Sequence, residues 1–582
     1  MMLRTLIAQC GATSVLLATA FLTSATAAPP PADTVLLHGR IITVDADDHV
    51  AQALAIRGGR IVRVGTDAEV SPLVGPHTRV IDLHGRAATP GLIDTHAHLL
   101  ETGLVELFRI DLSKADSIPA ITGAVAKRVA SAKPGEWVVG AGWDEGKLAE
   151  RRYPTAADLD RVAPNNPVWL ENTTGHYGVG NSLALKLGGV GPSTPNPAAG
   201  TIEHDAKGQP TGVLKETATD TVERLIPPPT LEQRRQAVTH MVERLRAEGM
   251  TGFKDPSISA EDWAAYRGLA TEERLGANAC VLFTTPPTLD AARQILDLIK
   301  TAQKDVAGLP PGATLRVCGA KIFMDGSGAA PTAWMYQDWN RERTEIATGN
   351  HGFPRLDPAI YRAQVKLFVN AGVGVGTHAI GDRSIDWVVD SYAGALAGHK
   401  GPAPMLTIIH ANTPTDHAIQ TMADLQKRYG SGVPESQGEF TWWIGDIYAA
   451  NLGPERSQRL NPFHTYLQRG VRWGGGSDSP VTPIEARYGI WASMTRETAR
   501  GTYGQTPFGV AEAVDIHAAL RSYTAWAAPQ VGEAGRTGVL KPGMSADIAV
   551  WDRDPYAVAP EKVKDMVCDL TLFQGRVVYE RR

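Results

Sequence analysis

The chain has 582 residues, of which 43% are hydrophobic and 20% are charged, with 59 glycines and 39 prolines. These proportions are ordinary for globular proteins, and they exclude a disordered or a collagen-like chain. The 57 Lys and Arg residues are nearly balanced by 62 Asp and Glu residues, which gives a net charge of -5. Because no basic surplus is present to neutralise phosphates, the composition argues against nucleic acid as a partner.

The first 28 residues differ in composition from the rest of the chain. Arg4 is the only charged side chain before Asp33, and an apolar run over residues 15–22 leads into small residues at 25–28. This order predicts a cleaved signal peptide over residues 1–28. The apolar run is too short for a membrane anchor, which needs about 20 apolar residues. We therefore expect a periplasmic or secreted protein without a stable membrane anchor, and a homodimer stays open.

Three cysteines follow the predicted signal peptide, namely Cys280, Cys318 and Cys568. They have no short paired spacing, which excludes a disulfide framework or a zinc ribbon. Two alternatives stay open, one disulfide formed in an oxidising compartment and three buried free thiols.

Short apolar segments separated by turns occur near both ends of the chain. Several lie within residues 34–81, and a similar pattern returns at residues 547–551 and 572–579. Such segments are typical of strands in hairpins. A single hairpin is only marginally stable in water, so we expect the strands of both ends to pair. The sequence predicts one β-sandwich built from residues 29–88 and 536–582.

The central part, residues 89–535, alternates apolar strand candidates with helical patterns. A strand candidate at residues 406–409 precedes a helical pattern at 415–428, and residues 471–474 and 484–496 repeat the order. Alternation of this kind predicts parallel βαβ units. No Gly-x-Gly-x-x-Gly motif opens a helix after an early strand, which argues against an open nucleotide-binding sheet. The predicted fold class is α/β, a TIM-like (β/α)8 barrel that carries the composite β-sandwich and an inserted subdomain.

The strongest local signal is the segment over residues 89–98, which ends in His96-Ala97-His98. Residues two apart on a strand point to the same side, so both histidines can reach one metal ion at a barrel mouth. A His-x-His pair alone is common, and a polar strand end is its simpler alternative. The preceding Pro90-Gly91 turn and the apolar pair after it favour the metal interpretation.

Four further polar residues each end an apolar strand candidate, at the place where barrel enzymes carry their chemistry. They are Lys321, His378, His410 and Asp478. Taken singly, a residue of this kind is more often structural than a ligand. Together with the two earlier histidines these residues give the order His, His, Lys, His, His, Asp, which indicates a metal centre.

The chain between His98 and Lys321 is longer than a plain barrel needs. About 220 residues separate the two, whereas three βα units need only about 95. We therefore expect an insertion of about 130 residues, over about 106–229, that roofs the active site.

These motifs resemble the amidohydrolase superfamily of metal-dependent hydrolases, and within it amidohydrolase family 3, the YtcJ-like branch. The resemblance covers nearly the whole mature chain. Beyond the His-x-His pair, the matching segments are Gly142-Trp143-Asp144 and residues 211–216, 321–326, 377–382, 476–480 and 538–547.

The resemblance implies a binuclear metal site. It places one metal on His96 and His98 and a second metal on His378 and His410, with Lys321 as a carboxylated bridge between them. A lysine carbamate presents two anionic oxygens that a plain amine lacks. Zinc accepts histidine nitrogen and carboxylate oxygen alike, which agrees with such a ligand set.

The implied reaction is hydrolysis by a metal-activated water. Two divalent ions lower the pKa of a shared water to near neutrality and polarise the scissile carbonyl. Asp478 is implied to bind metal, to take the proton of the water as catalytic base and to pass it to the leaving amine. We expect one or two divalent ions, with zinc as the favoured metal.

The expected function is that of an exported metal-dependent amidohydrolase that cleaves a carbon–nitrogen bond, other than a peptide bond, in a small apolar or aromatic substrate. A lactone or ester hydrolase on the same site is one alternative. A catalytically inactive solute-binding protein of the same fold is another, and the intact set of six ligand candidates argues against it.

Substrate contacts are expected near residues 172–176, where the chain departs from the family pattern and ends the segment with His176. The His176 side chain either binds a substrate carbonyl or anchors a loop. Trp143, Trp442 and Trp443 are expected to line an aromatic substrate pocket, and core packing is their alternative role.

Overall fold

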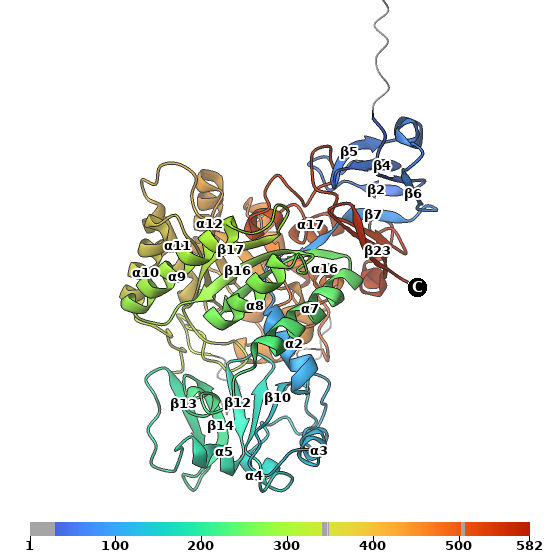
Figure 1. Cartoon of the computed structure of the whole chain (residues 1–582). Helices are drawn as coiled ribbons and strands as arrows, with labels where there is room; N and C mark the ends of the chain where they lie inside the picture. The colour runs from blue at the N-terminus through green and yellow to red at the C-terminus, as the bar shows by residue number, and fades with distance from the viewer. Residues whose placement is uncertain (1–29, 340–345, 347, 502–506) are drawn as a thin grey trace, which may run out of the picture.

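The computed structural model describes residues 30–339, 346, 348–501 and 507–582. The predicted signal peptide, residues 1–28, lies outside the described residues. Within the described part of the chain, no helix is both long and apolar enough to span a membrane. The barrel lies between the sheets of the chain ends on one side and an inserted sheet on the other (Figure 1).

Eight parallel strands form the central sheet, in the order β21-β20-β19-β18-β17-β16-β15-β8. The two outer strands of this order approach each other, because the Thr95 N–H donates to the Gly475 carbonyl oxygen at 3.0 Å. The sheet is therefore a nearly closed barrel, which confirms the TIM-like core expected from the sequence. The strands are β8 (Leu92–Asp94), β15 (Met250–Ile258), β16 (Asn278–Thr284), β17 (Leu315–Phe323), β18 (Gly374–Ala379), β19 (Leu406–His410), β20 (Val433–Ser436) and β21 (Gly474–Gly475).

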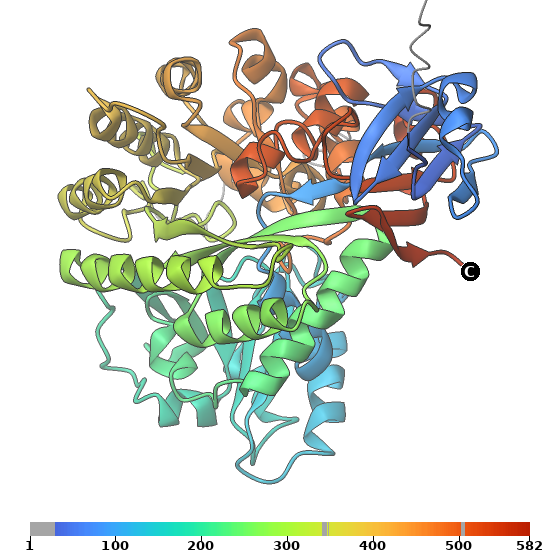
Figure 2. The same cartoon turned by 45° about the horizontal axis from the view of Figure 1, so that its top comes forward.

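Helices cover the outside of the barrel (Figure 2). Helix α9 is amphipathic, because the apolar residues Ala292, Leu296 and Ile299 lie on one face of it. This face is buried against the barrel sheet. Thr288 begins this helix by accepting a hydrogen bond from the Ala291 N–H. The covering helices are α2 (Leu99–Phe108), α7 (Leu231–Ala247), α8 (Ala260–Thr271), α9 (Leu289–Ala307), α10 (Pro358–Asn370), α11 (Asp382–Leu396), α12 (Asp416–Tyr429) and α16 (Ala486–Thr495).

Two helical patterns and one strand pattern of the sequence are confirmed at these elements. Residues 415–428 correspond to α12 with Thr415 as its N-cap, and residues 484–496 contain α16. The strand expected over residues 406–409 is β19. Shorter helices in the connections are α1 (Asp67–Val70), α13 (Gly438–Trp443), α14 (Gly445–Leu452), α15 (Phe463–Gln468) and α17 (Ile516–Ser522).

Strands from both ends of the chain pair in one sheet, as expected. Strand β7 pairs antiparallel with β22, with Ala88 opposite Val550. This six-stranded sheet has the order β24-β23-β22-β7-β2-β3, and a four-stranded sheet of order β5-β4-β1-β6 shares a hydrophobic core with it. The strands are β1 (Thr34–Leu37), β2 (Arg40–Ile42), β3 (Val50–Ala51), β4 (Ala53–Arg57), β5 (Arg60–Gly65), β6 (Arg79–Asp82), β7 (Ala87–Pro90), β22 (Ile548–Trp551), β23 (Cys568–Phe573) and β24 (Arg576–Glu580).

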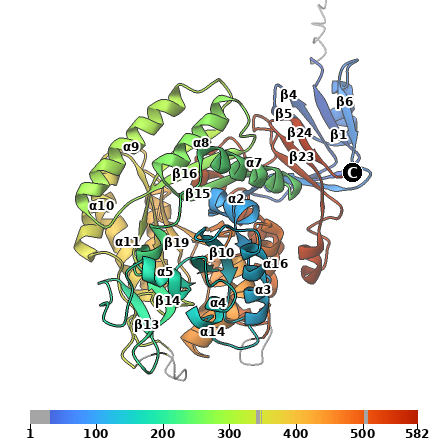
Figure 3. The same cartoon turned by 60° about the horizontal axis from the view of Figure 1, so that its bottom comes forward.

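A separate six-stranded sheet, of order β13-β14-β12-β11-β10-β9, lies between α2 and α7 in the sequence, inside the range expected for an insertion. It covers one end of the barrel, and Figure 3 brings that end forward. The Thr173 hydroxyl fixes it there by donating to the Val481 carbonyl oxygen at 2.9 Å. Its elements are β9 (Ile110–Asp111), α3 (Ile118–Val129), β10 (Val138–Trp143), α4 (Ala156–Asp160), β11 (Val168–Asn172), β12 (Tyr177–Gly180), α5 (Ser182–Leu187), β13 (Gly200–His204), β14 (Pro210–Glu216) and α6 (Asp220–Glu223).

The cysteines adopt one of the two arrangements that the sequence left open. Cys280 and Cys318 form a disulfide that joins the neighbouring barrel strands β16 and β17. Cys568 in β23 is a buried free thiol. The disulfide lies within the barrel wall and takes no part in the site described below.

Candidate metal centre and substrate cavity

All six predicted ligands lie at the carboxyl end of the barrel strands, where barrel enzymes carry their active sites. Two of them follow β8, one lies near the end of β17, one lies in β18, one ends β19 and one follows β21. Five of the six line one cavity, and the sixth, His96, is fully buried beside it. In this order the residues are His96 and His98, Lys321, His378, His410 and Asp478.

Asp478 joins the two histidines of the His-x-His pair. Its Oδ1 lies 3.1 Å from the Nε2 of His96 and 3.2 Å from the Nε2 of His98. Burial by itself raises the pKa of the Asp478 carboxyl, but the nearby histidines outweigh it and hold the pKa well below its ordinary value. Asp478 is therefore ionised and supplies the negative charge of the site.

His378 and His410 face each other through the nitrogens that a metal would use. The Nε2 of His378 donates to the Gly326 carbonyl oxygen at 3.0 Å, and the Nδ1 of His410 donates to the Gln437 Oε1 at 2.9 Å. The Gln437 amide donates in turn to the Glu435 carbonyl oxygen, which fixes its orientation. Each ring therefore keeps its other nitrogen as a lone-pair acceptor.

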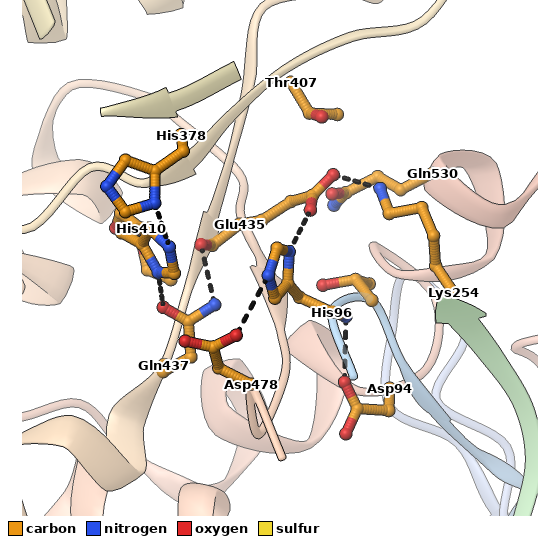
Figure 4. Close-up of polar contacts among 12 residues, drawn as sticks. Asp94, His96, Lys254, His378, Thr407, His410, Glu435, Gln437, Asp478 and Gln530 are labelled. Atoms are coloured by element: carbon orange, nitrogen blue, oxygen red, sulfur yellow. Dashed lines mark hydrogen bonds and ion pairs between the residues drawn. The ribbon is translucent and has the colours of Figure 1, made fainter. Parts of the chain in front are cut away.

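These two acceptor nitrogens, Nδ1 of His378 and Nε2 of His410, lie 3.0 Å apart (Figure 4). Burial lowers the pKa of His378 well below its ordinary value and lowers that of His410 to about 3, so neither ring carries a proton to place between them. Two lone pairs at this distance repel each other unless a cation binds both. Two histidine nitrogens on one zinc, each about 2.0–2.1 Å from the ion, lie roughly 3 Å apart.

Lys321 is fully buried, and its Nζ has no hydrogen-bond partner among the described residues. Burial lowers the pKa of the Lys321 amine to about 8. A buried amine without a partner is costly as it stands, whereas a carbamate formed on it would place anionic oxygens among the ligands. The environment of Lys321 therefore fits the carboxylated bridge that the sequence resemblance implies.

The donor set as a whole fits a divalent metal. One ligand atom each from His96, His410 and Asp478 lie within 4.8 Å of one another. The Nε2 of His96 is buried against the Asp478 carboxylate, 3.1 Å away, without a well-aligned hydrogen bond between them. Nitrogen and carboxylate oxygen donors that converge in this way are the ligands of zinc and similar ions.

Several charged or amide side chains that orient these ligands were missed by the sequence analysis. Glu435 in β20 accepts from the Nδ1 of His96 at 3.2 Å and also binds Lys254 of β15. Burial raises the pKa of the Glu435 carboxyl, but Lys254 and His96 together outweigh it and the pKa falls to about 2. Asp94 accepts from the His96 backbone N–H at 2.8 Å and from the Ser477 hydroxyl at 2.7 Å. The sequence did offer one signal for these residues, since each is a charged residue inside or at the end of an apolar strand.

A cavity of about 260 Å³ opens above the ligands, between the barrel and the inserted sheet. Its wall mixes charged, polar and apolar side chains. Besides the ligands, the wall includes Glu101, Glu171, Asn172, Thr173, Thr174, His176, Phe323, Arg355, Pro480 and Val481.

The three tryptophans expected to contact substrate do not line this cavity. Trp143 is fully buried in the inserted sheet, where its Nε1 donates to the Leu170 carbonyl oxygen at 2.9 Å. Trp442 packs against other aromatic rings, and Trp443 lies under the Lys147 ammonium, 3.4 Å from its ring centre. The structure thus gives these rings packing roles, because they point into cores of the insertion and of the helices beside it.

His176 does reach the cavity, and it is also anchored. Its Nδ1 lies 3.0 Å from the Glu216 carboxylate, and its ring centre lies 5.0 Å from that of His378. The buried Glu216 also accepts from the Thr332 hydroxyl at 2.5 Å, and Arg355 approaches it at 3.6 Å. The two roles left open by the sequence are therefore compatible, since Glu216 fixes one ring nitrogen and leaves Nε2 for a ligand.

Residues 79–579 match the amidohydrolase family. The chain belongs to the amidohydrolase family. Its relatives in this family include the N-substituted formamide deformylase of Arthrobacter pascens, which is 30% identical over 94% of this chain and 98% of that protein. YtcJ of Bacillus subtilis is 27% identical over 93% of this chain and 98% of that protein.

The fold of this amidohydrolase is shared with solved structures. A metal-dependent hydrolase from Pyrococcus horikoshii superposes with a TM-score of 0.68 at 24% identity, covering 90% of this chain and 99% of that one. A second from Pyrococcus furiosus gives a TM-score of 0.66 with the same coverage. The chain is an enzyme, a metal-dependent hydrolase of carbon–nitrogen bonds other than peptide bonds.

Proposed function

We propose that this amidohydrolase cleaves the carbon–nitrogen bond of a small N-substituted amide with a metal-activated water. The relative from Arthrobacter pascens, whose name makes it a deformylase of N-substituted formamides, supports this substrate class. The observation that carries the proposal is the pair of unprotonated ligand nitrogens of His378 and His410, 3.0 Å apart at the floor of a substrate-sized cavity.

Different residues of the chain have different roles in the proposed reaction. A divalent metal held by the six ligands would acidify a water molecule and polarise the scissile carbonyl. The ionised Asp478, at the edge of the cavity, accepts the proton of the attacking water and returns it to the leaving nitrogen. His176, held through its Nδ1 by Glu216, directs its Nε2 at the substrate.

The cavity limits the size and character of the substrate. Its volume of about 260 Å³ suits a small molecule and not a polymer. Phe323, Pro480 and Val481 offer apolar contact, while Arg355 adds a positive charge and the protonated Glu171 adds a polar group. With Trp143, Trp442 and Trp443 elsewhere, the case for an aromatic substrate is weaker than the sequence suggested, and a small amide with a short apolar group agrees better with the wall.

We also propose that the mature protein is exported, that it uses zinc and that the two sheets of the chain ends form one β-sandwich. The leader-like residues 1–28 and the Cys280–Cys318 disulfide support export, because disulfides persist in oxidising compartments. The histidine and carboxylate donors support zinc. The hydrophobic core shared by the two sheets supports the sandwich.

A substrate panel tests the proposed activity. N-substituted formamides and acetamides would be compared with esters and lactones of the same carbon skeleton, before metal removal by a chelator, after it and after zinc is restored. We expect amide hydrolysis that is lost with the metal and regained with zinc. His378→Ala should abolish it, whereas His417→Ala, at an exposed side chain of α12, should not. Ester hydrolysis without amide hydrolysis would overturn the substrate class.

A further inference from the structure

Two oppositely charged side chains are buried in the barrel beneath the metal ligands, and the proposed reaction does not use them. Lys254 and Glu435 have side-chain exposures of 2% and 0%, and their Nζ and Oε1 atoms form an ion pair. They lie 181 residues apart in the chain, on β15 and β20. Because the two outer strands of the sheet, β8 and β21, approach each other, they lie between β15 and β20 on that side of the barrel. The ion pair therefore spans the barrel below the segments that carry the ligands.

The pair is connected to one ligand by direct contact. The second carboxylate oxygen of Glu435, Oε2, lies 3.2 Å from the Nδ1 of His96, as Figure 4 shows. The opposite ring nitrogen of His96, Nε2, faces Asp478 at 3.1 Å. The backbone carbonyl of Lys254 also accepts from the Ala97 N–H at 2.9 Å, which holds the segment between the two ligand histidines.

Stability alone does not account for such a pair. Taking two charges out of water costs about as much as their attraction returns, and well-packed apolar replacements of buried ion pairs are often neutral or stabilising. Partners that hold the free nitrogen of a ligand histidine, in contrast, fix its tautomer and raise its basicity, and losing them typically costs 10–100-fold in metal affinity. Glu435 is a partner of this second type, because it binds the free ring nitrogen of the ligand candidate His96.

We propose that Lys254 and Glu435 act together as positioning residues for the metal ligand His96. Glu435 binds the Nδ1–H of His96 and so keeps Nε2 directed at the metal, and its negative charge strengthens that ligand. Lys254 orients the carboxylate and offsets part of its charge, which limits how tightly the metal is held. The inference rests on the proposed metal-dependent function, and it adds a determinant of metal affinity outside the ligand set.

The test measures zinc binding and not turnover. The zinc Kd would be obtained by competition with a chromophoric chelator, and the Tm of each protein would be measured with and without zinc. We expect Glu435→Gln to weaken zinc binding about 10–100-fold. The double variant Lys254→Met/Glu435→Gln removes both charges, so we expect its metal-free Tm to be at or near the wild-type value while zinc binding stays weakened.

The single variants give an independent signature. Because binding to the native state raises Tm, the zinc-induced rise in Tm reports the strength of binding. We expect a smaller rise than in the wild type for Glu435→Gln. For Lys254→Met we expect a larger rise, because the buried carboxylate then has the metal as its remaining counter-charge. A purely structural pair would lower the metal-free Tm in both single variants and would change the zinc-induced rise in neither.

A control ion pair and the wild-type protein distinguish failure of this inference from failure of the proposed function. Arg316→Met/Glu533→Gln removes an ion pair at the start of β17, away from the ligands, and should leave the zinc Kd unchanged. Wild-type zinc affinity in the double variant at Lys254 and Glu435 would overturn the inference and leave the proposed function standing. Absence of zinc binding in the wild type would instead overturn the proposed function.

Discussion

Asp478 lies where the two histidines of the His-x-His pair meet, 3.1 and 3.2 Å from their Nε2 atoms. Its left-handed backbone, with φ of 57°, is uncommon for a residue other than glycine and is held by a hydrogen bond from its N–H to the His96 carbonyl oxygen at 2.6 Å. Strained conformations of this kind persist where the surrounding structure enforces them, often at active sites. The backbone thus holds the Asp478 carboxylate between the two histidines, the position that the proposed ligand and proton-transfer roles require.

Asp478→Asn keeps the size of the side chain and one oxygen donor but removes the base. General acid–base catalysis typically contributes about 10²–10⁴-fold, so we expect kcat to fall by at least that factor while much of the metal remains. Steady-state kinetics and elemental analysis check both parts. Asp382→Asn is the matched control, because Asp382 begins α11 and accepts from the backbone N–H groups of Tyr336 and Arg383. Near-normal kcat with a lowered Tm in Asp478→Asn would assign the carboxylate a capping role instead.

Glu171, in the cavity wall, holds its proton to unusually high pH. Burial, together with the carboxylates of Glu223 and Glu101, raises the pKa of Glu171 from 4.5 to about 8. Between these values the folded protein binds more protons than the unfolded chain, so this group makes stability fall as pH rises from about 4.5 to 8.

We expect Glu171→Gln to remove that contribution, because glutamine does not titrate. The Tm of the variant should be close to that of the wild type near pH 5 and should exceed it above pH 8, when the wild-type carboxylate is ionised beside Glu223 and Glu101. Thermal melts across this range check the prediction. Glu561→Gln changes an exposed glutamate and should show no such trend. A Tm difference for Glu171→Gln that is constant with pH would contradict the assignment.

At the scale of elements, the inserted sheet brings His176 to a cavity whose candidate metal ligands all come from the barrel. His176 precedes β12, Glu216 ends β14, and these two strands pair antiparallel. Gly212 lies within β14 with a φ of 103°, and a Cβ placed there would lie 2.6 Å from the Gly180 carbonyl oxygen and 2.8 Å from the Ala156 nitrogen. The pairing that positions His176 therefore depends on a residue without a side chain.

Gly212→Ala should displace β14 from its neighbours and so disturb the His176–Glu216 contact. We expect a lower kcat/KM with unchanged metal content, and a loss of stability of about 1–3 kcal/mol from the steric overlap. Gly208→Ala is the control in the adjacent turn. Gly208 also has a positive φ, 76°, but no atom lies within 4 Å of its added Cβ, so only the backbone penalty of roughly 1–2 kcal/mol applies. Equal effects of the two variants on kcat/KM would contradict this account.

At the scale of the whole molecule, the two chain ends meet where the chain enters the barrel. Strand β7, paired with β22 near the C-terminus, continues within two residues into β8, after which His96 and His98 follow. The end sheets thus anchor the first barrel strand and the segment that carries two ligands. This arrangement explains why a strand pattern near residue 550 belongs to the same structural unit as the opening of the barrel.

The sequence could place the six candidate ligands at one end of the barrel because their signals are local. His96 and His98 share a strand end, and His378, His410 and Asp478 each follow an apolar segment, so alternation and strand ends were enough. The barrel and the pairing of the chain ends followed from the same patterns.

Contacts between distant segments could not be predicted in this way. Glu435 contacts Lys254 across 181 residues of the chain. No local sequence pattern indicates that these two side chains form an ion pair. The sequence left two environments open for Trp143, because alternate residues of a strand face opposite sides and the sequence of the insertion does not tell which side faces the cavity. Its ring packs against Tyr153 and Tyr177.

The central claim is that the six ligands hold a catalytic divalent metal, and elemental analysis of purified variants tests it most directly. Wild-type protein, Lys321→Ala, His410→Ala and the surface control His417→Ala would be prepared in parallel with zinc in the medium. We predict about one to two equivalents of metal in the wild type and the control, and a loss of about one equivalent or more in the two site variants. Metal-free wild-type protein with full hydrolytic activity, or site variants that retain the wild-type metal content, would contradict the account.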